Sequence, residues 1–134
     1  MSPALDHIRV RDCMHQGILS CSEDAPLSEV AAAMAKHRVH AVAITSGGSR
    51  RPGGVLSDLD VVRAAAAGAE PSAAGEAASE PLAVSADDPL HRAAQLMVEH
   101  GVAHLIVLDA ASGHPIGVIS TLDVAAVYAS GAHE

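Results

Sequence analysis

Two stretches of the chain carry apolar side chains at helical spacing. The first begins at Leu27 and places apolar residues three, four, seven and eight positions further on, as far as Ala35. The second begins at Leu90 and follows the same spacing to Val98. A proline stands directly before each series, with an aspartate upstream, which is typical of a helix start. The pattern predicts two amphipathic helices, at 27–35 and 90–98.

Short apolar runs predict strands around both helices. They lie at 19–21, 41–44 and 54–56 in the first half of the chain, and at 82–84, 105–108 and 116–119 in the second half. The polar, glycine-rich stretches 45–53 and 109–115 predict hairpin loops. The last helix of each half is expected to begin at Ser57 or Ser120. This β-α-β-β-α order in both halves predicts a mixed α/β (α+β) fold.

The two halves are copies of one unit. A shift of 63 positions lays Asp24 on Asp87 and carries residues 54–61 onto 117–124, so that Gly-Val-Leu-Ser-Asp-Leu-Asp-Val meets Gly-Val-Ile-Ser-Thr-Leu-Asp-Val. A unit of about 60 residues buries too little surface to be secure alone. We therefore expect the two copies to pack together through their sheets.

The repeats set the expected domain boundaries. One repeat is expected at 8–67 and the other at 80–130, with residues 68–79 as the linker and the lead-in to the second copy. The alanine-rich stretch 64–78 is interrupted by Gly68, Pro71 and Gly75. Its low complexity is typical of a helix end followed by a mobile loop.

The charge balance excludes several kinds of partner. The 134 residues include 8 Lys and Arg against 16 Asp and Glu, a formal net charge of −8, so a nucleic acid would be repelled over most of the surface. The single aromatic residue, Tyr128, predicts an aliphatic core without stacking surfaces for bases. No apolar run approaches the roughly 20 residues of a membrane span, and residues 1–11 lack the pattern of a signal peptide. Cys13 and Cys21 are interpreted as small buried side chains. We expect a cytoplasmic protein that binds neither nucleic acid nor membrane.

Three sets of residues carry a resemblance to a known family. The sets are the lead-in Val10-Arg11-Asp12-Cys13-Met14, the Asp-x-Pro-Leu helix starts followed by Met34 and Met97, and the two Gly-h-h-Ser-x-x-Asp endings at 54–60 and 117–123, where h is apolar. Together, in two ordered copies from Ile8 to Tyr128, they resemble the tandem cystathionine-β-synthase (CBS) domain pair, or Bateman module.

This resemblance implies a fold, a ligand and a role. Pairs of this family form a pseudo-two-fold disk, commonly dimerise, and bind adenosyl compounds such as AMP, ADP, ATP, S-adenosylmethionine or NAD in clefts between the repeats. They usually regulate a protein partner rather than catalyse, and the resemblance implies no required cofactor. The chain departs from the family pattern at Val42 and Ile106, where proline is frequent, and at Ala78, which replaces the methionine of the lead-in. These departures leave the shape of the clefts open.

Ser57 and Asp60, with their copies Ser120 and Asp123, are the main candidate ligand-binding residues. A serine hydroxyl at a helix start can hold a phosphate or ribose oxygen, and an aspartate one turn later can accept hydrogen bonds from both hydroxyls of a ribose. The alternative is a capping box, because Ser-x-x-acid caps a helix without any ligand. The preceding glycine, which lets another group approach the backbone, and the family resemblance favour the ligand interpretation.

The resemblance adds further residues to the expected ligand set. His40 and His104, aligned with one gap, match a position where the family often carries Arg or His that reaches ligand phosphates, although a surface histidine at a strand edge is an equal alternative. An imidazole at a phosphate would make binding depend on pH. Ile18 and Leu82, beside the first strands, are expected to line the clefts, and Arg38 to contribute charge. Four arginines, Arg38, Arg50, Arg51 and Arg63, cluster in the first copy, and Ala126 stands opposite the last of them. The two clefts are therefore expected to differ in charge.

Metal binding and catalysis are not expected. The nine histidines include the pairs His37 and His40, and His100 and His104, but each pair straddles a predicted helix end and no cysteine lies nearby. Catalysis requires a nucleophile beside a base, or paired carboxylates in a closed pocket, and the chain offers only two symmetric Ser-x-x-Asp sets. A non-catalytic module that binds an adenosyl ligand and forms a homodimer through alanine-rich helix faces is predicted. The competing hypothesis is a ligand-free interaction module that docks on an enzyme or transporter.

Overall fold

A computed structural model describes the chain at residues 3–46, 53–68 and 73–132. The contacts within it divide the chain into two compact units. The first-repeat unit comprises Ile18–Pro81. The second-repeat unit comprises Leu82–Glu134 together with the amino-terminal segment Met1–Gly17.

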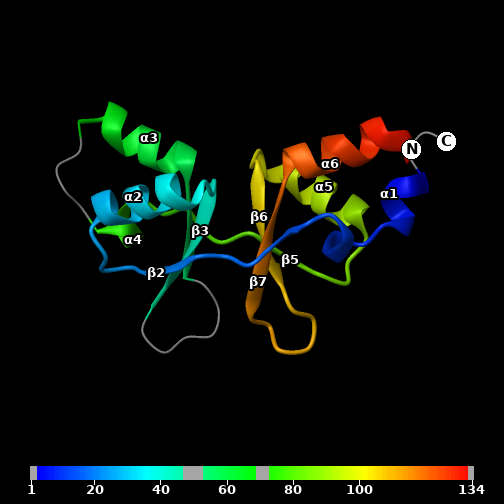
Figure 1. The fold of residues 1–134 in the computed structure, drawn as a ribbon, viewed down its shortest axis with the longest axis horizontal. Helices are drawn as coiled ribbons and strands as arrows, with labels where there is room; N and C mark the ends of the chain where they lie inside the picture. Colours follow the sequence, from blue (N-terminus) through cyan, green and yellow to red (C-terminus); the bar gives the residue numbers. More distant parts are fainter. Residues whose placement is uncertain (1–2, 47–52, 69–72, 133–134) are drawn as a thin grey trace. The chain divides into compact units, whose positions relative to one another are not determined.

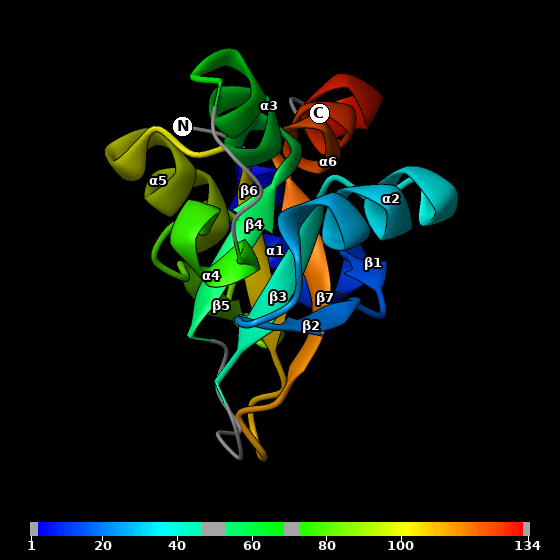
Figure 2. The same ribbon diagram turned by 90° about the vertical axis from the view of Figure 1, so that its left-hand side faces the viewer.

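A three-stranded sheet with helices on one of its faces forms the first-repeat unit (Figure 1). β2 (Ser20–Ser22) runs parallel to β3 (Ala41–Thr45), which pairs antiparallel with β4 (Gly54–Ser57). α2 (Leu27–His37), α3 (Asp58–Ala66) and the short α4 (Ala74–Ala77) contact one another, and Figure 2 shows α2 and α4 in front of the strands. The buried core of this unit consists of Val30, Met34, Val42, Ile44, Leu56 and Ala74.

The second-repeat unit repeats this arrangement with one more strand. β5 (Ala83–Ser85) runs parallel to β6 (His104–Leu108), β6 pairs antiparallel with β7 (Pro115–Ser120), and β1 (His15–Gln16) adds to the free edge of β7. α5 (Leu90–His100), α6 (Thr121–Val127) and α1 (Pro3–His7) lie beside the sheet, with a 3₁₀ turn at Val10–Asp12 and a π-helical turn at Tyr128–Ala132. Its buried core consists of Val10, Val84, Ala86, Leu90, Ala93, Met97, Leu105, Val107 and Ile119.

The predicted order of strand, helix, strand, strand, helix is confirmed in both units. α2 and α5 begin directly after Pro26 and Pro89, as the proline signal predicted, and run two residues beyond the predicted ends. Each helix is followed by a residue in the left-handed conformation, Arg38 at φ 55° and Gly101 at φ 62°, which stops the helix. The predicted hairpins are also confirmed, because β3–β4 and β6–β7 pair antiparallel; residues 47–52 of the first hairpin lie outside the described residues.

The strand registers carry the repeat down to single residues. Ala41 lies opposite Ser57 in the first unit, and His104 lies opposite Ser120 in the second. Both pairs are related by the shift of 63 positions. Residues that are 63 positions apart therefore occupy equivalent places in the two units. An alignment of the two repeats needs no gap within these strands.

Each repeat is preceded by a lead-in pentapeptide, 10–14 or 74–78. The lead-in of the first repeat packs in the second-repeat unit, and the lead-in of the second repeat packs in the first-repeat unit. Val10 is wholly buried in the second-repeat unit, and its N–H donates to the Asp88 carbonyl at 2.9 Å. Ala74 is wholly buried in the first-repeat unit, and its N–H donates to the Ala25 carbonyl at 2.8 Å. The lead-ins thus match with a shift of 64, one position more than the rest of the repeat.

This exchange corrects the expectation of a mobile loop for residues 74–78 of the alanine-rich stretch. α3 continues to Ala66, and α4 is a packed helical turn whose first residue is buried. Residues 69–72 of this stretch lie outside the described residues. Within residues 3–46, 53–68 and 73–132, every helix is too short or too polar to cross a bilayer.

Candidate functional site

Both Ser-x-x-Asp sets form complete capping boxes. The Ser57 N–H donates to Asp60 Oδ2 at 2.9 Å, and the Asp60 N–H donates to Ser57 Oγ at 3.2 Å. The second copy is almost identical, with 2.8 Å from the Ser120 N–H to Asp123 Oδ2 and 3.2 Å for the return bond. The capping interpretation is therefore confirmed at both positions. The box uses one carboxylate oxygen of each aspartate and leaves the second oxygen, Oδ1, to other partners.

The Oδ1 atoms of the two aspartates contact different side chains. Asp60 Oδ1 accepts a hydrogen bond from Ser79 Oγ at 2.9 Å and lies 3.6 Å from Arg63 Nη1. Asp123 Oδ1 lies 3.0 Å from His15 Nε2. Asp60 is 6% exposed, whereas the side chain of Asp123 is 13% exposed and that of His15 is 77% exposed. Each Oδ1 is thus contacted by a side chain from the segment that directly follows a lead-in.

Ser79 and His15 hold equivalent positions. Ser79 forms an antiparallel bridge with Val55, and His15 pairs with Val118, which is the copy of Val55. Sequence analysis missed both residues. A signal was present, because each directly follows its lead-in pentapeptide, 10–14 or 74–78.

The glycine that begins each motif serves this contact. A Cβ at Gly117 would collide with the His15 carbonyl oxygen, and a Cβ at Gly54 would lie 3.2 Å from both the Ala78 Cβ and the Ser79 carbonyl oxygen. The sequence predicted that another group approaches the backbone here. That group is the lead-in of the chain itself, so the glycines alone do not indicate a ligand.

The two histidines proposed as counterparts are not equivalent. His104 lies opposite Ser120, and facing residues of an antiparallel pair share one side of the sheet. The residue opposite Ser57 is Ala41. His40 precedes β3, and its Nδ1 lies 2.9 Å from Asp58 Oδ2. The one-gap alignment was wrong, since the strand register requires no gap.

The predicted arginines lie at separate places in the first-repeat unit. Arg63 lies beside Asp60, and Ala126 holds its position in α6 under the shift of 63. Arg38 is exposed at the end of α2, on a groove between α2 and α3. Arg50 and Arg51 lie outside the described residues. Of the predicted cations, Arg63 thus lies directly at a capping box.

Ile18 and Leu82 lie at the starts of the first strands, but they are not counterparts. The Leu82 carbonyl accepts from the Ile106 N–H at 3.0 Å, and its side chain packs against the buried core. The equivalent bond in the first unit runs from the Ala43 N–H to the Leu19 carbonyl at 2.9 Å. Leu19 is therefore the copy of Leu82, and Ile18 is half-buried one residue earlier.

The thiols are placed for packing. Burial raises the pKa of Cys13, with smaller contributions from the charges of Asp12 and Asp123, and burial also raises the pKa of Cys21. Both cysteines are free thiols. A raised pKa keeps a thiol protonated and unreactive at neutral pH. Within the described ranges, no three His, Cys, Asp or Glu side chains gather as a group that could hold a metal ion.

Comparison with known proteins decides the family. The family model described as "CBS domain" matches residues 10–67 and 74–130. The chain belongs to the CBS domain family. A CBS domain protein of Pyrobaculum aerophilum, PAE2072, solved in complex with AMP, is 31% identical; the match covers 95% of this chain and all of that one, with a TM-score of 0.84.

Two further CBS structures resemble this chain. The CBS domain pair of protein MJ0100, in complex with 5′-methylthioadenosine and S-adenosyl-L-methionine, shares the fold at 16% identity, with a TM-score of 0.82 over 92% of this chain and 97% of that one. Hypoxic Response Protein I, with two coordinated zinc ions, is 28% identical over 89% of this chain and 98% of its own, with a TM-score of 0.73. A search of curated proteins finds no match. CBS domain pairs are generally regulatory modules.

Proposed function

We propose that this CBS protein is a non-catalytic regulatory module that binds an adenosyl ligand at its two capping boxes. In this proposal the carboxylates of Asp60 and Asp123 accept hydrogen bonds from the vicinal hydroxyls of the ribose through Oδ1, and Ser57 and Ser120 lie next to the phosphate or sulfonium end. The observation that supports it most is the pair of identical boxes, each with an aspartate oxygen that the cap does not use. The complex of the 31%-identical protein with AMP indicates the adenosyl class.

Charges next to each box favour different ligands. The first residue of α3, Asp58, places a carboxylate beside Ser57, and its Oδ1 accepts from the Leu59 N–H at 2.9 Å. The first residue of α6 is the neutral Thr121, and His104 lies opposite Ser120. A phosphate near Ser57 would meet the like charge of Asp58, since Arg63 lies at Asp60 Oδ1, the oxygen that this proposal assigns to the ribose. A phosphate near Ser120 would meet an imidazole. We therefore propose that phosphate-bearing ligands such as AMP prefer the second-repeat box. A cationic ligand such as S-adenosylmethionine is better suited to the first.

Calorimetric titration with AMP tests this proposal. Asp123→Asn is the informative variant, because the amide oxygen can still accept from the Ser120 N–H while an N–H₂ group replaces the outer acceptor. We expect AMP affinity to fall roughly tenfold or more in Asp123→Asn and to change less in Asp60→Asn. Asp109→Asn, in the β6–β7 hairpin, is the matched control. Unchanged affinity in both box variants would reduce the Ser-x-x-Asp sets to helix caps.

Assembly, location and partner belong to the same proposal. We propose a homodimer in the cytoplasm that acts on a partner protein, which is the behaviour that the sequence predicts. Light scattering at micromolar concentration separates the dimer from a 13.5 kDa monomer. AMP should also raise the melting temperature, since a ligand that binds only the native state stabilises it. A co-purifying protein with no such rise would favour the ligand-free interaction module instead.

A further inference from the structure

The outer oxygen of Asp123 is held by a histidine from the amino-terminal segment. His15 Nε2 lies 3.0 Å from Asp123 Oδ1, and both residues belong to the second-repeat unit. The imidazole is largely exposed to solvent, whereas the carboxylate is mostly buried. The contact thus joins an exposed base, which can take up a proton from solvent, to the carboxylate oxygen that the capping box does not use.

The first repeat holds the matching oxygen with groups that keep their charge. Ser79 occupies the equivalent position beside β4, and its hydroxyl donates to Asp60 Oδ1 at 2.9 Å. Arg63, 3.6 Å from the same oxygen, stays charged at any physiological pH. A hydroxyl stays neutral over the same range, whereas an imidazole gains a proton between about pH 8 and about pH 5. The two repeats therefore differ at this position in whether the contact responds to pH.

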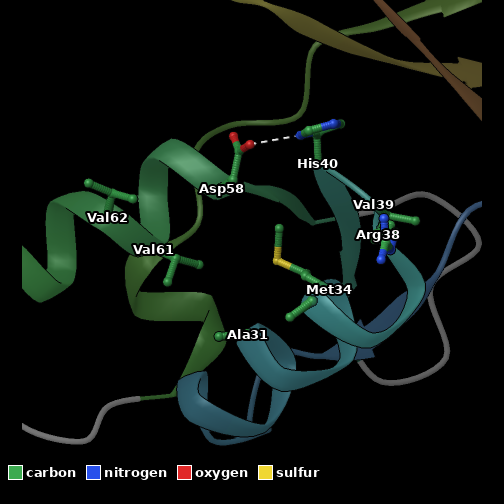
Figure 3. A pocket seen from close by; sticks show the side chains of 9 residues that line it. Ala31, Met34, Arg38, Val39, His40, Asp58, Val61 and Val62 are labelled. Carbon is green, nitrogen blue, oxygen red and sulfur yellow. Dashed lines mark hydrogen bonds and ion pairs between the residues drawn. The ribbon is translucent and has the colours of Figure 1, made fainter.

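A histidine also contacts an aspartate in the first-repeat unit, but at a different place. His40 Nδ1 lies 2.9 Å from Asp58 Oδ2, and Figure 3 shows this contact at the start of α3. Asp58 is the first residue of that helix, whereas the acid of the capping box is Asp60. The imidazoles of His40 and His15 are similarly exposed. The His40 contact is therefore a matched control for a contact made on a capping-box carboxylate.

Two histidines lie on the same side of the sheet as the second capping box. Val118 and Ser120 are two positions apart on β7 and therefore share one side of the sheet. His15 pairs with Val118, and His104 pairs with Ser120. Facing residues of antiparallel strands also share a side. His15 thus approaches the box from β1 and His104 from β6, which flank β7 on its two edges.

The histidines are the groups around this box that change charge between about pH 8 and about pH 5. β7 contributes no titratable side chain, and α6 contributes Asp123. The lead-in contributes Asp12 and the thiol of Cys13, whose pKa is raised by burial. Aspartates are ordinarily charged, and thiols of raised pKa neutral, over this range. The charge at the second box therefore depends on pH through His15 and His104.

We propose that His15 is a proton-operated gate on the second-repeat box. This inference rests on the proposed function of that box. With a charged imidazole, His15 attracts Asp123 Oδ1 and competes with the ribose hydroxyls for this acceptor. With a neutral imidazole, the ionic attraction is lost, and the exposed side chain can turn away into solvent. Adenosyl binding at this box therefore weakens as the pH falls, and the first box, held by Ser79, lacks such a gate.

NMR titration of the full chain with adenosine tests the gate. Adenosine has the ribose hydroxyls but no phosphate, so the attraction of a charged imidazole for a phosphate does not enter. The amide signals of Ser120 and Thr121 report the affinity at the second box. We expect this affinity to fall about threefold from about pH 8 to about pH 5.5, which is the size of the effect of an exposed ion pair. Equal affinities at the two pH values would overturn the gate.

Three variants assign the effect to one histidine. His15→Ser reproduces Ser79 of the first repeat and should bind adenosine equally well at both pH values. His104→Ala reproduces Ala41, its partner position in the first repeat, and should keep the threefold change. His40→Ser removes the matched control contact and should also keep it. A pH dependence that persists in His15→Ser, or that disappears in either of the other two variants, would overturn the proposal.

A measurement without ligand tests the contact itself. Urea denaturation of His15→Ser, Asp123→Asn and the double variant gives the coupling between the two side chains. The coupling should be larger at about pH 5.5 than at about pH 8, because a charged imidazole attracts the carboxylate more strongly than a neutral one. Equal coupling at both pH values would overturn the gate even where adenosine binds. A wild type that binds adenosine at neither pH would overturn the proposed function, and the gate with it, so the two failures are distinct.

Discussion

The capping boxes of the two repeats have the same backbone hydrogen bonds, but different side chains contact the outer carboxylate oxygen of each aspartate. Both boxes have the same two backbone hydrogen bonds within 0.1 Å of each other. Around them, Asp60 contacts Ser79 and Arg63, whereas Asp123 contacts His15. The bonds within the box are local and hold the strand–helix turn, so both copies retain them. The outer oxygen is where the copies differ, which is expected if each repeat serves a different ligand or role.

The largest effect that we expect distinguishes the two glycines at the lead-ins. Gly117→Ala forces a methyl group into the His15 carbonyl and should separate β1 from β7, at a cost of about 2–4 kcal/mol in the free energy of unfolding. Gly54→Ala meets its neighbours at 3.2 Å and should cost about 1 kcal/mol. Urea denaturation of both variants measures the difference. Equal costs would mean that the two lead-ins are held alike.

Next in size is the loss of the caps. Ser57→Ala and Ser120→Ala each remove the acceptor for one N–H at a helix start, and each should lower the free energy of unfolding by about 1 kcal/mol. The loss should be somewhat larger for Ser120, because its hydroxyl also donates to Asp123 Oδ2 at 3.0 Å in addition to the matching cap. Thermal unfolding followed by circular dichroism gives both numbers. A clearly larger cost for Ser57 would contradict this ranking.

The smallest effects separate the two lead-in contacts. Ser79→Ala leaves the buried Asp60 oxygen without a hydroxyl donor and should cost about 1 kcal/mol. His15→Ala removes a partner that is mostly exposed, so water replaces it, and the expected cost is only about 0.3 kcal/mol. The same denaturation experiment ranks them. The reverse order would place the more important lead-in contact at Asp123.

The helices and strands and their order were predictable because apolar residues recur along the chain at regular spacing. Apolar residues at helical spacing fixed α2 and α5, and the repeat extended each assignment to the other half. The serine caps were predictable for the same reason, since a capping box is a local motif. These features depend on neighbours within a few positions in the chain.

The exchange of lead-ins and the partners of Oδ1 depend on contacts far apart in sequence. Ala74 carries no pattern that distinguishes it from the other alanines nearby, and its burial arises only when it packs in the first-repeat unit. His15 and Asp123 are more than a hundred positions apart and meet through the pairing of β1 with β7. The misaligned His40 shows the same limit, because a one-residue ambiguity is resolved only by strand register.

A nucleotide titration distinguishes ribose binding at the capping boxes from helix capping alone. In the proposed binding mode, the outer carboxylate oxygens of Asp60 and Asp123 bind the ribose hydroxyls of an adenosyl ligand. Calorimetry should compare AMP with its 2′,3′-dideoxy analogue, which keeps the base and the phosphate and lacks both hydroxyls. We predict that the analogue binds at least about tenfold more weakly, because the buried acceptors lose their donors. Equal affinities for the two nucleotides would show that the aspartates do not bind the ribose hydroxyls.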